Sequence, residues 1–457
     1  MAKIKQATVK IEKFQFPNIG IGINSETGDK VQIKRALPGQ VVDVRVKKGK
    51  GQLLSVLERA SNEVLPLCPN TDRCGGCTFQ TLRYEDELML KRDMVLDLFK
   101  KAEISLPLKC EPVEVRPAPN IYGYRNKMEF SFGDEYRDGP LSIGLRGPGS
   151  HYEVCDGAFC NICHPDFNKI VTLTRDFFRD RNSNFYHKTR KIGHLRHLVI
   201  RRGEHTGDIL INLVTTPGLK VDGFAQALLE LKLEGHIRGI LHTLNESVAD
   251  IVRPDHVELL HGEDFFYDNC LGLKFKIYPF SFFQTNTLGA ELLYETVREF
   301  AETTAEDKGD IFDLYCGTGT IAQILSRSAA RIYGIEIVES AVIAARENAA
   351  LNNIKNCEFI EGDVNKETLA PLTAEGIRPG VIVIDPPRDG IHPKAIMPII
   401  NFGAKKLIYV SCKPTSLVRD LEVFLENGYE LTNLRIHDMF PRSYHVETVV
   451  LLERRNF

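Results

Sequence analysis

One cysteine of this chain, Cys412, occupies a position where a thiol could act as a nucleophile. It follows the apolar run Lys406-Leu-Ile-Tyr-Val-Ser411, which predicts a buried strand, and it precedes Lys413-Pro414. The thiolate is the reactive form of cysteine, and Lys413 and Arg388 are candidate cations to favour it. Buried cysteines elsewhere are usually inert packing residues, and this is the expectation for Cys110, Cys270 and Cys357.

Two carboxylates are placed to assist such a thiolate. Glu447 opens the apolar run that ends the chain and is a candidate general base, although an exposed carboxylate at a strand end is the alternative. Asp385 ends the run Gly380-Val-Ile-Val-Ile and begins Asp385-Pro-Pro-Arg388. Because proline fixes φ, two prolines would stiffen a turn that holds the carboxylate over a reacting centre. An ordinary strand-ending turn is the alternative for this motif.

A glycine-containing turn indicates a cofactor site. In Asp313-Leu-Tyr-Cys-Gly-Thr-Gly-Thr320 two glycines follow a predicted strand, which lets a ligand approach the N-terminus of the next helix. Glu336 ends the next predicted strand, where it can accept hydrogen bonds from ribose hydroxyls, and Asp363 ends the third, where it could meet adenine. Such turns also suit nicotinamide enzymes, but these do not need the Asp-Pro-Pro turn, so S-adenosylmethionine is favoured. Gln284, in Phe282-Phe-Gln-Thr-Asn286, could hold the cofactor's carboxylate or the edge of a base.

These residues need a sheet that brings strand ends together. From 279 to 457, apolar runs alternate with helical patterns, which predicts a doubly wound, Rossmann-like α/β sheet with ligands at the carboxyl ends of its strands. Residues 1–60 contain short β-branched runs separated by glycines and predict a five-stranded OB-like barrel. The region 61–278 is expected to form a central α+β domain that includes a linker at 102–120.

Composition and charge favour a soluble protein that binds nucleic acid. The net charge of −3 argues against a uniformly basic surface. However, residues 1–60 hold twelve Lys and Arg against five Asp and Glu, and residues 181–202 hold seven basic residues and no acid. A solvated basic face is the alternative for either segment alone, but two of them beside a catalytic motif set favour a surface that follows phosphates. No apolar run approaches the roughly 20 residues of a membrane span, so no membrane association, a cytoplasmic location and reduced cysteines are expected.

Five motifs, taken in order, resemble the uracil-C5 RNA methyltransferase family. The resemblance covers nearly the whole chain, from an N-terminal region similar to a TRAM domain, through Tyr124-Arg-Asn-Lys127, to the last strand. Two positions depart from the family pattern: Thr320 stands where some members place Asn, and Lys413 where Asn is common. The five motifs are Phe282-Phe-Gln-Thr-Asn286, Asp313-Leu-Tyr-Cys-Gly-Thr-Gly319, Asp385-Pro-Pro-Arg388, Ser411-Cys-Lys-Pro414 and His445-Val-Glu-Thr-Val449.

The resemblance implies a class I methyltransferase domain that transfers a methyl group from S-adenosylmethionine to carbon 5 of a uridine in RNA. It implies that Cys412 adds to C6 of the ring, which makes C5 nucleophilic, and that Glu447 then removes the C5 proton. A stacked base cannot reach such a pocket, so the target uridine is expected to be flipped out or to lie in a loop. Cofactor contacts are implied for Gln284, Tyr315, Thr320, Glu336, Asp363 and Asp385.

A cysteine cluster near the barrel predicts a metal centre. Cys68, Cys74 and Cys77 are spaced Cys-x5-Cys-x2-Cys, and Gly75-Gly76 permits a tight wrap. By ligand count alone, a [4Fe-4S] cluster and a four-thiolate zinc site both fit. The resemblance to the iron-sulfur branch of the family favours [4Fe-4S]. In that branch the fourth ligand follows a strand similar to Ile143-Gly-Leu-Arg146, which implies Cys160, with Cys155 and Cys163 as competitors.

Several functions are open at this point. Because the transfer-RNA branch of the family typically lacks the cysteine cluster, 23S ribosomal RNA is the expected substrate and a transfer-RNA uridine is the alternative. A non-catalytic RNA-binding or assembly protein is disfavoured by the presence of both Cys412 and Glu447. A methyltransferase that acts on cytosine or on an exocyclic amine is a further alternative, and amine methylation would not need Cys412. The protein is expected to be monomeric.

Overall fold

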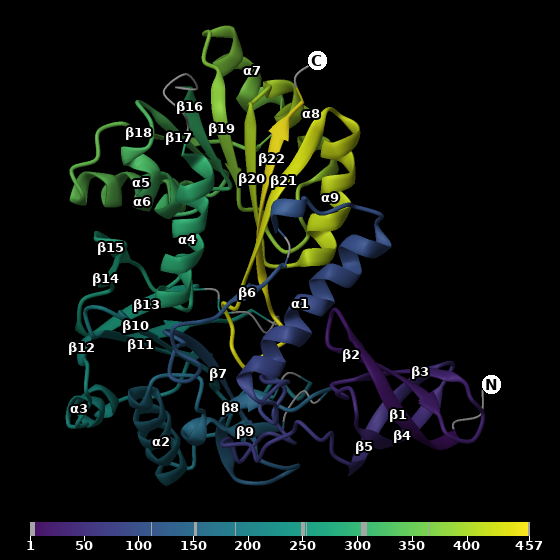
Figure 1. The fold of residues 1–457 in the computed structure, drawn as a ribbon. Helices are drawn as coiled ribbons and strands as arrows, with labels where there is room; N and C mark the ends of the chain where they lie inside the picture. The colour runs from purple at the N-terminus through teal and green to yellow at the C-terminus, as the bar shows by residue number, and fades with distance from the viewer. Residues whose placement is uncertain are drawn as a thin grey trace.

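Three β structures organise the chain, as seen in a computed structural model that describes residues 5–110, 112–149, 153–187, 189–247, 252, 254–302, 309–364 and 366–455. They are a closed barrel, a seven-stranded sheet and an eight-stranded sheet, and a two-stranded hairpin accompanies them. In Figure 1 the barrel lies at one side of the molecule and the eight-stranded sheet lies above the seven-stranded one. In the part of the chain so described, no helix is long and apolar enough to cross a membrane.

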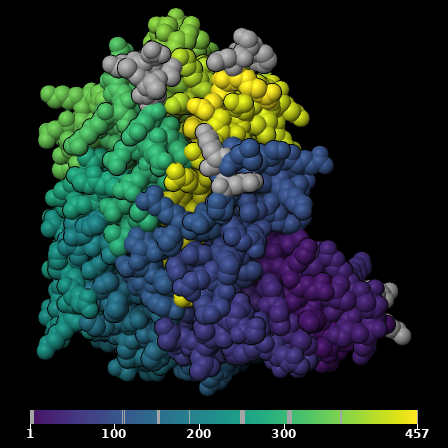
Figure 2. All heavy atoms as spheres, viewed as in Figure 1, coloured from purple at the N-terminus to yellow at the C-terminus, as the bar shows by residue number. Residues whose placement is uncertain are grey.

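The barrel is built from the first five strands. In Lys30-Val-Gln-Ile-Lys34, the buried Val31 and Ile33 alternate with exposed residues, because successive side chains of a strand point to opposite faces. Apolar side chains of this kind fill the interior. Figure 2 shows the barrel projecting from the rest of the molecule. Its strands follow the order β1 (Lys5–Gln15), β2 (Ile19–Asn24), β3 (Lys30–Lys34), β5 (Lys50–Glu58) and β4 (Val41–Lys47).

The seven-stranded sheet lies in the middle of the chain. Helices α2 (Pro165–Asp180) and α3 (Phe224–Leu229) share a core with it in which Phe167, Phe178 and Phe224 are fully buried. All its neighbouring strands are antiparallel except β11 and β12, which run parallel. The strand order is β13 (His256–Gly262), β12 (His236–Leu244), β11 (Asp208–Thr215), β10 (Leu195–Arg202), β7 (Lys127–Asp134), β8 (Leu141–Arg146) and β9 (Val154–Asp156), after which comes η2 (Gly157–Phe159).

The eight-stranded sheet positions the predicted catalytic residues at the ends of its strands. Its first five strands are parallel, whereas β22 runs antiparallel to both of its neighbours. The expected Rossmann-like sheet is therefore mixed, because a C-terminal hairpin extends it. The short edge strand β6 comes from the segment that was expected to be a linker. The order is β18 (Cys357–Glu361), β17 (Ile332–Glu336), β16 (Asp310–Leu314), β19 (Pro379–Ile384), β20 (Lys406–Ser411), β22 (Glu447–Arg454), β21 (Tyr429–His437) and β6 (Val115–Arg116).

Helices cover both faces of this sheet, which explains its nearly continuous apolar strands. Ile311 and Val383 belong to one core and Phe312 and Ile384 to the other. The first core contains α4 (Thr287–Ala301), α5 (Thr320–Ile324), α6 (Glu339–Leu351) and the hairpin of β14 (Phe266–Cys270) and β15 (Leu273–Ile277). The second contains α1 (Tyr84–Lys101), α7 (Lys366–Ala374), α8 (Pro393–Phe402) and α9 (Pro414–Glu426). Short helices η1 (Leu108–Cys110) and η3 (Leu325–Arg327) complete the described elements.

Candidate active site

The predicted catalytic residues lie along one edge of the eight-stranded sheet. Asp385 directly follows β19 and Cys412 directly follows β20, and these two strands are parallel. Because β22 is antiparallel to β20, its first residue, Glu447, lies at the same edge, one position beyond the pair Ser411–Thr448. The carboxyl ends of β16, β17 and β18 lie at the same edge. Tyr315 follows β16, Glu336 is the last residue of β17, and Asp363 lies just beyond β18.

The turn after β16 exposes backbone at the start of α5. Gly317 and Gly319 have positive φ angles of 53° and 73°. No atom lies within 4 Å of the position of a Cβ on Gly317, whereas a Cβ on Gly319 would meet the Phe359 ring at 2.6 Å. The carboxylate of Glu336 accepts hydrogen bonds from the backbone N–H of Gly317 at 3.0 Å and of Val338 at 2.9 Å. The turn is therefore held against β17 on one side and has room for a ligand on the other.

The other predicted cofactor residues flank this turn. Tyr315 adopts a positive φ of 65°, and burial raises the pKa of its hydroxyl to about 12, with a further contribution from the charge of Asp363. Thr320 is the first residue of α5 and is 8% exposed. Asp363 is exposed beyond β18. Tyr315 and Thr320 thus lie at the two ends of the turn after β16, and Asp363 lies beyond β18 at the same sheet edge.

Asp313, within β16, is a residue whose role the sequence analysis missed. It is fully buried, and one carboxyl oxygen accepts a hydrogen bond from the Ala322 N–H at 2.9 Å. Burial raises the pKa of this carboxyl to about 8, and the negative charges of Asp385 and Glu336 act in the same direction. The contact ties α5 to β16 and so fixes the shape of the turn. The sequence did contain a sign of this role, since Asp313 is an acidic residue within an otherwise apolar predicted strand.

Cys412 and Asp385, both half-buried, and the buried Glu447 lie close together beside the exposed Arg388. Burial raises the pKa of the Cys412 thiol to about 11; the charges of Glu447 and Asp385 raise it, and Arg388, hydrogen-bonded to the thiol, lowers it. Burial also raises the pKa of Asp385 to about 7. The pKa of Glu447 lies well above its ordinary value because of burial and of Asp385, and Arg388 opposes this. Arg388 thus opposes the rise in pKa at Cys412 and Glu447, whereas burial accounts for the rise at Asp385.

Of the two cations suggested for the thiol, Arg388 acts on it and Lys413 pairs elsewhere. The Nζ atom of Lys413 lies 3.8 Å from the carboxylate of Asp389. Lys413 also occupies the N-cap position of α9, and its backbone N–H donates to the Ser411 Oγ at 3.2 Å. The main influences on the pKa of the Cys412 thiol include Arg388 and do not include Lys413, so Arg388 is the cation that the structure supports as its partner.

Replacement of Arg388 by Met should move the pH dependence of the reaction to higher pH. The guanidinium lowers the pKa of the Cys412 thiol, so its loss reduces the thiolate fraction at a given pH. We expect the rising limb of the kcat/KM profile, which reports groups of the free enzyme, to move up by about one pH unit. Arg388→Lys should show a smaller displacement because it keeps a charge. An unchanged profile for Arg388→Met would show that this cation does not act on the nucleophile.

Gln284 is positioned by the central sheet. The side-chain amide of Asn126 donates to the Gln284 carbonyl at 3.1 Å and to the Thr287 Oγ1 at 2.7 Å, and its backbone N–H donates to the Thr285 carbonyl at 2.9 Å. The Gln284 side chain is hydrogen-bonded to the Tyr294 side chain, and the charge of Asp385 contributes to raising the pKa of the Tyr294 hydroxyl. The motif containing Asn126 thus fixes the segment that brings Gln284 toward Asp385.

Part of the basic segment 181–202 is structural. Arg196 and Arg201 are only 4% and 3% exposed. Arg201 donates to the backbone carbonyls of Tyr278 and Ser281 at 2.7 and 2.8 Å, and Arg196 donates to the Asn245 carbonyl at 2.8 Å. These two guanidinium groups bind backbone rather than face solvent, so the expectation that they belong to a phosphate-binding surface is wrong.

Cysteine thiols converge on a cavity between the cysteine-rich segment and β9. The pKa of Cys77 is raised to about 12, first by burial and then by the charges of Cys160, Cys74 and Cys68. Cys163 does not line the cavity; its thiol donates to the Cys160 carbonyl and the Asn168 Oδ1, both at 3.4 Å. Within the described ranges, no group of three or more His, Cys, Asp or Glu side chains has the arrangement of a formed metal site. The cysteines that line the cavity are Cys68, Cys74, Cys77, Cys155 and Cys160.

Comparisons with known proteins agree with this architecture. Residues 269–455 match the family model tRNA (Uracil-5-)-methyltransferase. A protein of Caldanaerobacter subterraneus named as an uncharacterized RNA methyltransferase is 44% identical over 99% of this chain and 100% of its own length. A Clostridium tetani protein of the same name is 42% identical over 100% of this chain and 99% of its own.

A solved structure has the same fold over nearly the full length. It is the Pyrococcus abyssi tRNA (uracil-54, C5)-methyltransferase in complex with S-adenosyl-L-homocysteine, with a TM-score of 0.75 and 23% identity over 97% of this chain and 100% of that one. At this identity the likeness establishes the fold. Together with the full-length relatives and the family match, it leads to one assignment: the chain belongs to the RNA uracil-C5 methyltransferase family, whose members are S-adenosylmethionine-dependent enzymes.

Proposed function

We propose that this enzyme methylates carbon 5 of a uridine through a covalent bond between Cys412 and C6 of the ring. The observation that carries the proposal is the proximity of Asp385, Glu447 and Arg388 to the Cys412 thiol, at the same sheet edge as the glycine turn. Amine methylation would need no such thiol. The geometry therefore favours uracil-C5 chemistry over the alternative of an exocyclic amine.

The first step is addition of the thiolate. The Cys412 sulfur donates an electron pair to C6, and the C5–C6 π electrons move toward O4 to give an enolate-like ring. S-adenosylmethionine, when bound, supplies an electrophilic methyl group to which C5 forms its new bond while the sulfonium–methyl bond breaks. Negative charge has by then left the sulfur, which lowers the cost of ionising the neighbouring Glu447 carboxyl.

The second half of the reaction restores the ring. The Glu447 carboxylate accepts the proton from C5, the electrons of that C–H bond re-form the C5–C6 double bond, and the pair of the S–C6 bond returns to Cys412. Glu447 suits this role because burial keeps its pKa high, so it is a stronger base than an ordinary carboxylate once it is ionised.

The methyl donor would lie against the glycine turn. Open space beside Gly317 and the Glu336 carboxylate support a site for its ribose and amino-acid parts. Tyr315 and Thr320 flank the turn in the chain, Asp363 follows β18 at the same sheet edge, and Asp385 would orient the reacting end. We assign cofactor binding to Gln284, Tyr315, Thr320, Glu336, Asp363 and Asp385.

Within RNA, the substrate we propose is 23S ribosomal RNA. The support is the cysteine-lined cavity together with the resemblance to the iron-sulfur branch. The test is to map 5-methyluridine by mass spectrometry in ribosomal and transfer RNA from a strain without this gene and from the strain complemented with it. Loss from 23S RNA, restored on complementation, supports the proposal. Loss confined to transfer RNA assigns the alternative substrate.

The cavity would hold a [4Fe-4S] cluster ligated by Cys68, Cys74, Cys77 and Cys160, with structural zinc as the alternative. We expect Cys160→Ser to reduce the iron content and visible absorption of the anaerobically purified protein several-fold, whereas Cys163→Ser should retain both because Cys163 does not line the cavity. Equal iron loss in both variants would contradict the ligand assignment. Zinc in place of iron in the unaltered protein would identify a zinc site.

We divide the chain into three functional parts on the same basis. Residues 1–60 would serve as a TRAM-like RNA-binding barrel, residues 61–278 as the domain that carries the metal centre, and residues 279–457 as the methyltransferase domain. The barrel, the seven-stranded sheet and most of the eight-stranded sheet fall in these three ranges in that order, which supports the division.

A further inference from the structure

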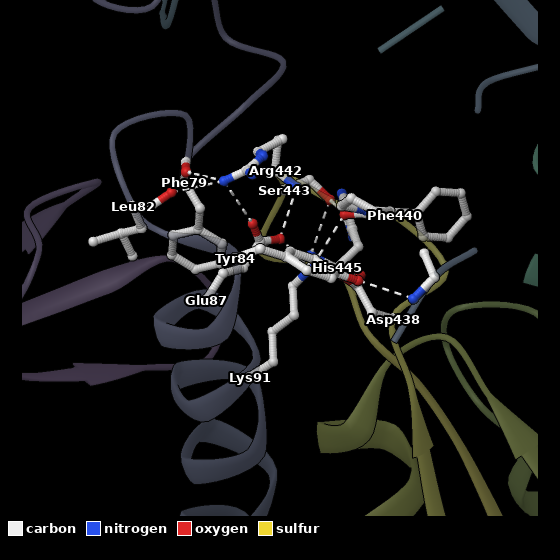
Figure 3. Close-up of polar contacts among 12 residues, drawn as sticks. Phe79, Leu82, Tyr84, Glu87, Lys91, Asp438, Phe440, Arg442, Ser443 and His445 are labelled. Carbon is white, nitrogen blue, oxygen red and sulfur yellow. Dashed lines mark hydrogen bonds and ion pairs between the residues drawn. The ribbon is translucent and has the colours of Figure 1, made fainter. Parts of the chain in front are cut away.

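Four charged side chains form a buried network between α1 and residues 438–446, the segment that joins β21 to β22. Figure 3 shows Glu87 and Lys91 on the helix beside the segment that carries Asp438 and Arg442. None of the four is more than 5% exposed. The Lys91 Nζ lies 2.7 Å from the Glu87 carboxylate and 2.6 Å from that of Asp438, and the Arg442 guanidinium lies 3.5 Å from Glu87. Two cations balance two anions in this Lys91 network.

The Lys91 network also fixes the backbone of the 438–446 segment. Lys91 donates to the Phe440 carbonyl at 3.2 Å, and the Glu87 carboxylate accepts the Arg442 backbone N–H at 2.7 Å. The Arg442 carbonyl in turn accepts the Phe79 N–H at 2.9 Å. Since these hydrogen bonds are made to main-chain atoms, they fix the backbone position of the segment as well as its side chains.

Three further side chains hold the same segment from other directions. The Tyr84 hydroxyl donates to the Asp438 carboxylate at 2.9 Å and the Tyr124 hydroxyl to the Pro441 carbonyl at 3.0 Å. The Asn286 side-chain amide donates to the Met439 carbonyl at 2.9 Å. These donors come from α1, from the approach to β7 and from the end of the Gln284 motif. Figure 1 shows the yellow segment running down beside α1.

The segment leads directly to the proposed base. His437, the last residue of β21, pairs with Glu447, the first residue of β22, so the 438–446 segment closes the hairpin at that pair. His445 lies within the segment, and its pKa is lowered to about 4, first by burial and then by Arg388, Arg125 and Lys91. One residue of the segment, His445, is therefore influenced electrostatically both by Lys91 of the network and by Arg388, the cation that acts on Cys412.

Ionic contacts of this kind suit positioning better than stability. Burying four charges costs desolvation, and well-packed apolar side chains can be as stable. The charged hydrogen bonds instead restrict the positions of the groups they join, because each requires a particular distance and angle. We propose that the Lys91 network is a positioning device that holds Glu447 in reach of the C5 proton after methyl transfer. The inference rests on the proposed base role of Glu447 and makes Glu87, Lys91, Asp438 and Arg442 positioning residues.

A selective effect on the last half of the reaction follows. The contacts of the network described above join α1 to the 438–446 segment, whereas Cys412 and Asp385 follow β20 and β19, so addition to C6 and methyl transfer should persist when the network is cut. Proton removal should slow. The covalent enzyme–RNA complex, already methylated at C5, should then accumulate.

The charge-balanced double variant Lys91→Met with Asp438→Asn cuts the network, since one cation and one anion are lost and the Glu87–Arg442 pair remains. Single-turnover reactions of the full chain with methyl-labelled S-adenosylmethionine and RNA bearing tritium at C5 measure methyl transfer and proton release separately. We expect proton release to slow at least about tenfold while methyl transfer changes less than about threefold, with labelled RNA retained on the denatured protein. Tyr84→Phe, which removes the hydrogen bond to Asp438 and the one that the hydroxyl accepts from the Ala118 N–H, should give a smaller effect in the same direction.

Two reference variants separate the possible outcomes. Asp97→Asn with Lys101→Met removes a half-exposed ion pair elsewhere on α1 and should leave both rates unchanged. Glu447→Gln should trap the complex; if it releases RNA normally, the base role itself is wrong. If Glu447→Gln traps and the double variant does not, or if the double variant slows both steps equally, the positioning inference is overturned.

Discussion

Replacement of Cys412 by Ala should reduce methyl transfer to RNA by at least about 10⁴-fold. The sulfur supplies the electron pair that makes C5 nucleophilic. The carboxylates of Asp385 and Glu447 are much weaker nucleophiles than a thiolate and Arg388 is a cation, so these neighbours should not replace it. Loss of a nucleophile has effects of this size or larger in enzymes that use one. The measurement is transfer of label from methyl-labelled S-adenosylmethionine to RNA.

The control for this substitution is Cys357→Ala. Cys357 is a half-buried cysteine of the same domain, at the start of β18, and its thiol contacts the Ala322 carbonyl at 3.5 Å. It lies at the opposite end of a strand from the site edge, so activity should stay within about twofold of the unaltered enzyme. Substantial methylation by Cys412→Ala would favour the alternative of an exocyclic amine as the methyl acceptor.

Replacement of Glu447 by Gln should lower turnover by about 10²- to 10⁴-fold, the usual contribution of a general base. Gln has nearly the same shape, and it removes only the ability to take a proton. Since the base acts after the methyl group has been transferred, a methylated covalent complex should accumulate, which denaturing electrophoresis with labelled RNA detects. Glu453→Gln, a carboxylate near the far end of the same strand, is the matched control. Slow turnover without the complex would assign Glu447 a role before methyl transfer.

Much of this site could be predicted from the sequence because strand ends are local features. Asp385 and Cys412 each directly follow an apolar run. Such a run predicts a buried strand, so the residue after it lies at an edge of the sheet whatever the fold of the other segments. The short β-branched runs of residues 1–60 likewise predicted strands, and five strands form the barrel there. The glycine turn was visible for the same reason, since positive φ angles at Gly317 and Gly319 need this residue type.

The features that were missed depend on contacts between distant residues. Lys413 and Arg388 are equally basic in sequence, and only the pairing of Lys413 with Asp389 separates them. Arg196 and Arg201 were predicted to belong to a basic surface, and only the structure shows that their guanidinium groups bind backbone carbonyls. The Lys91–Asp438 contact joins residues 347 positions apart, and no local periodicity encodes it.

The most direct test of the account is to identify the atom that bonds the uridine ring. RNA in which the target uridine carries fluorine at C5 cannot lose a proton there, so after methyl transfer the adduct should remain. Incubation with S-adenosylmethionine, nuclease and protease digestion, and mass spectrometry of the peptides should then locate a methylated 5-fluorouridine nucleotide on Cys412. An adduct on another residue, or methylated RNA released without any adduct, would contradict the proposed mechanism.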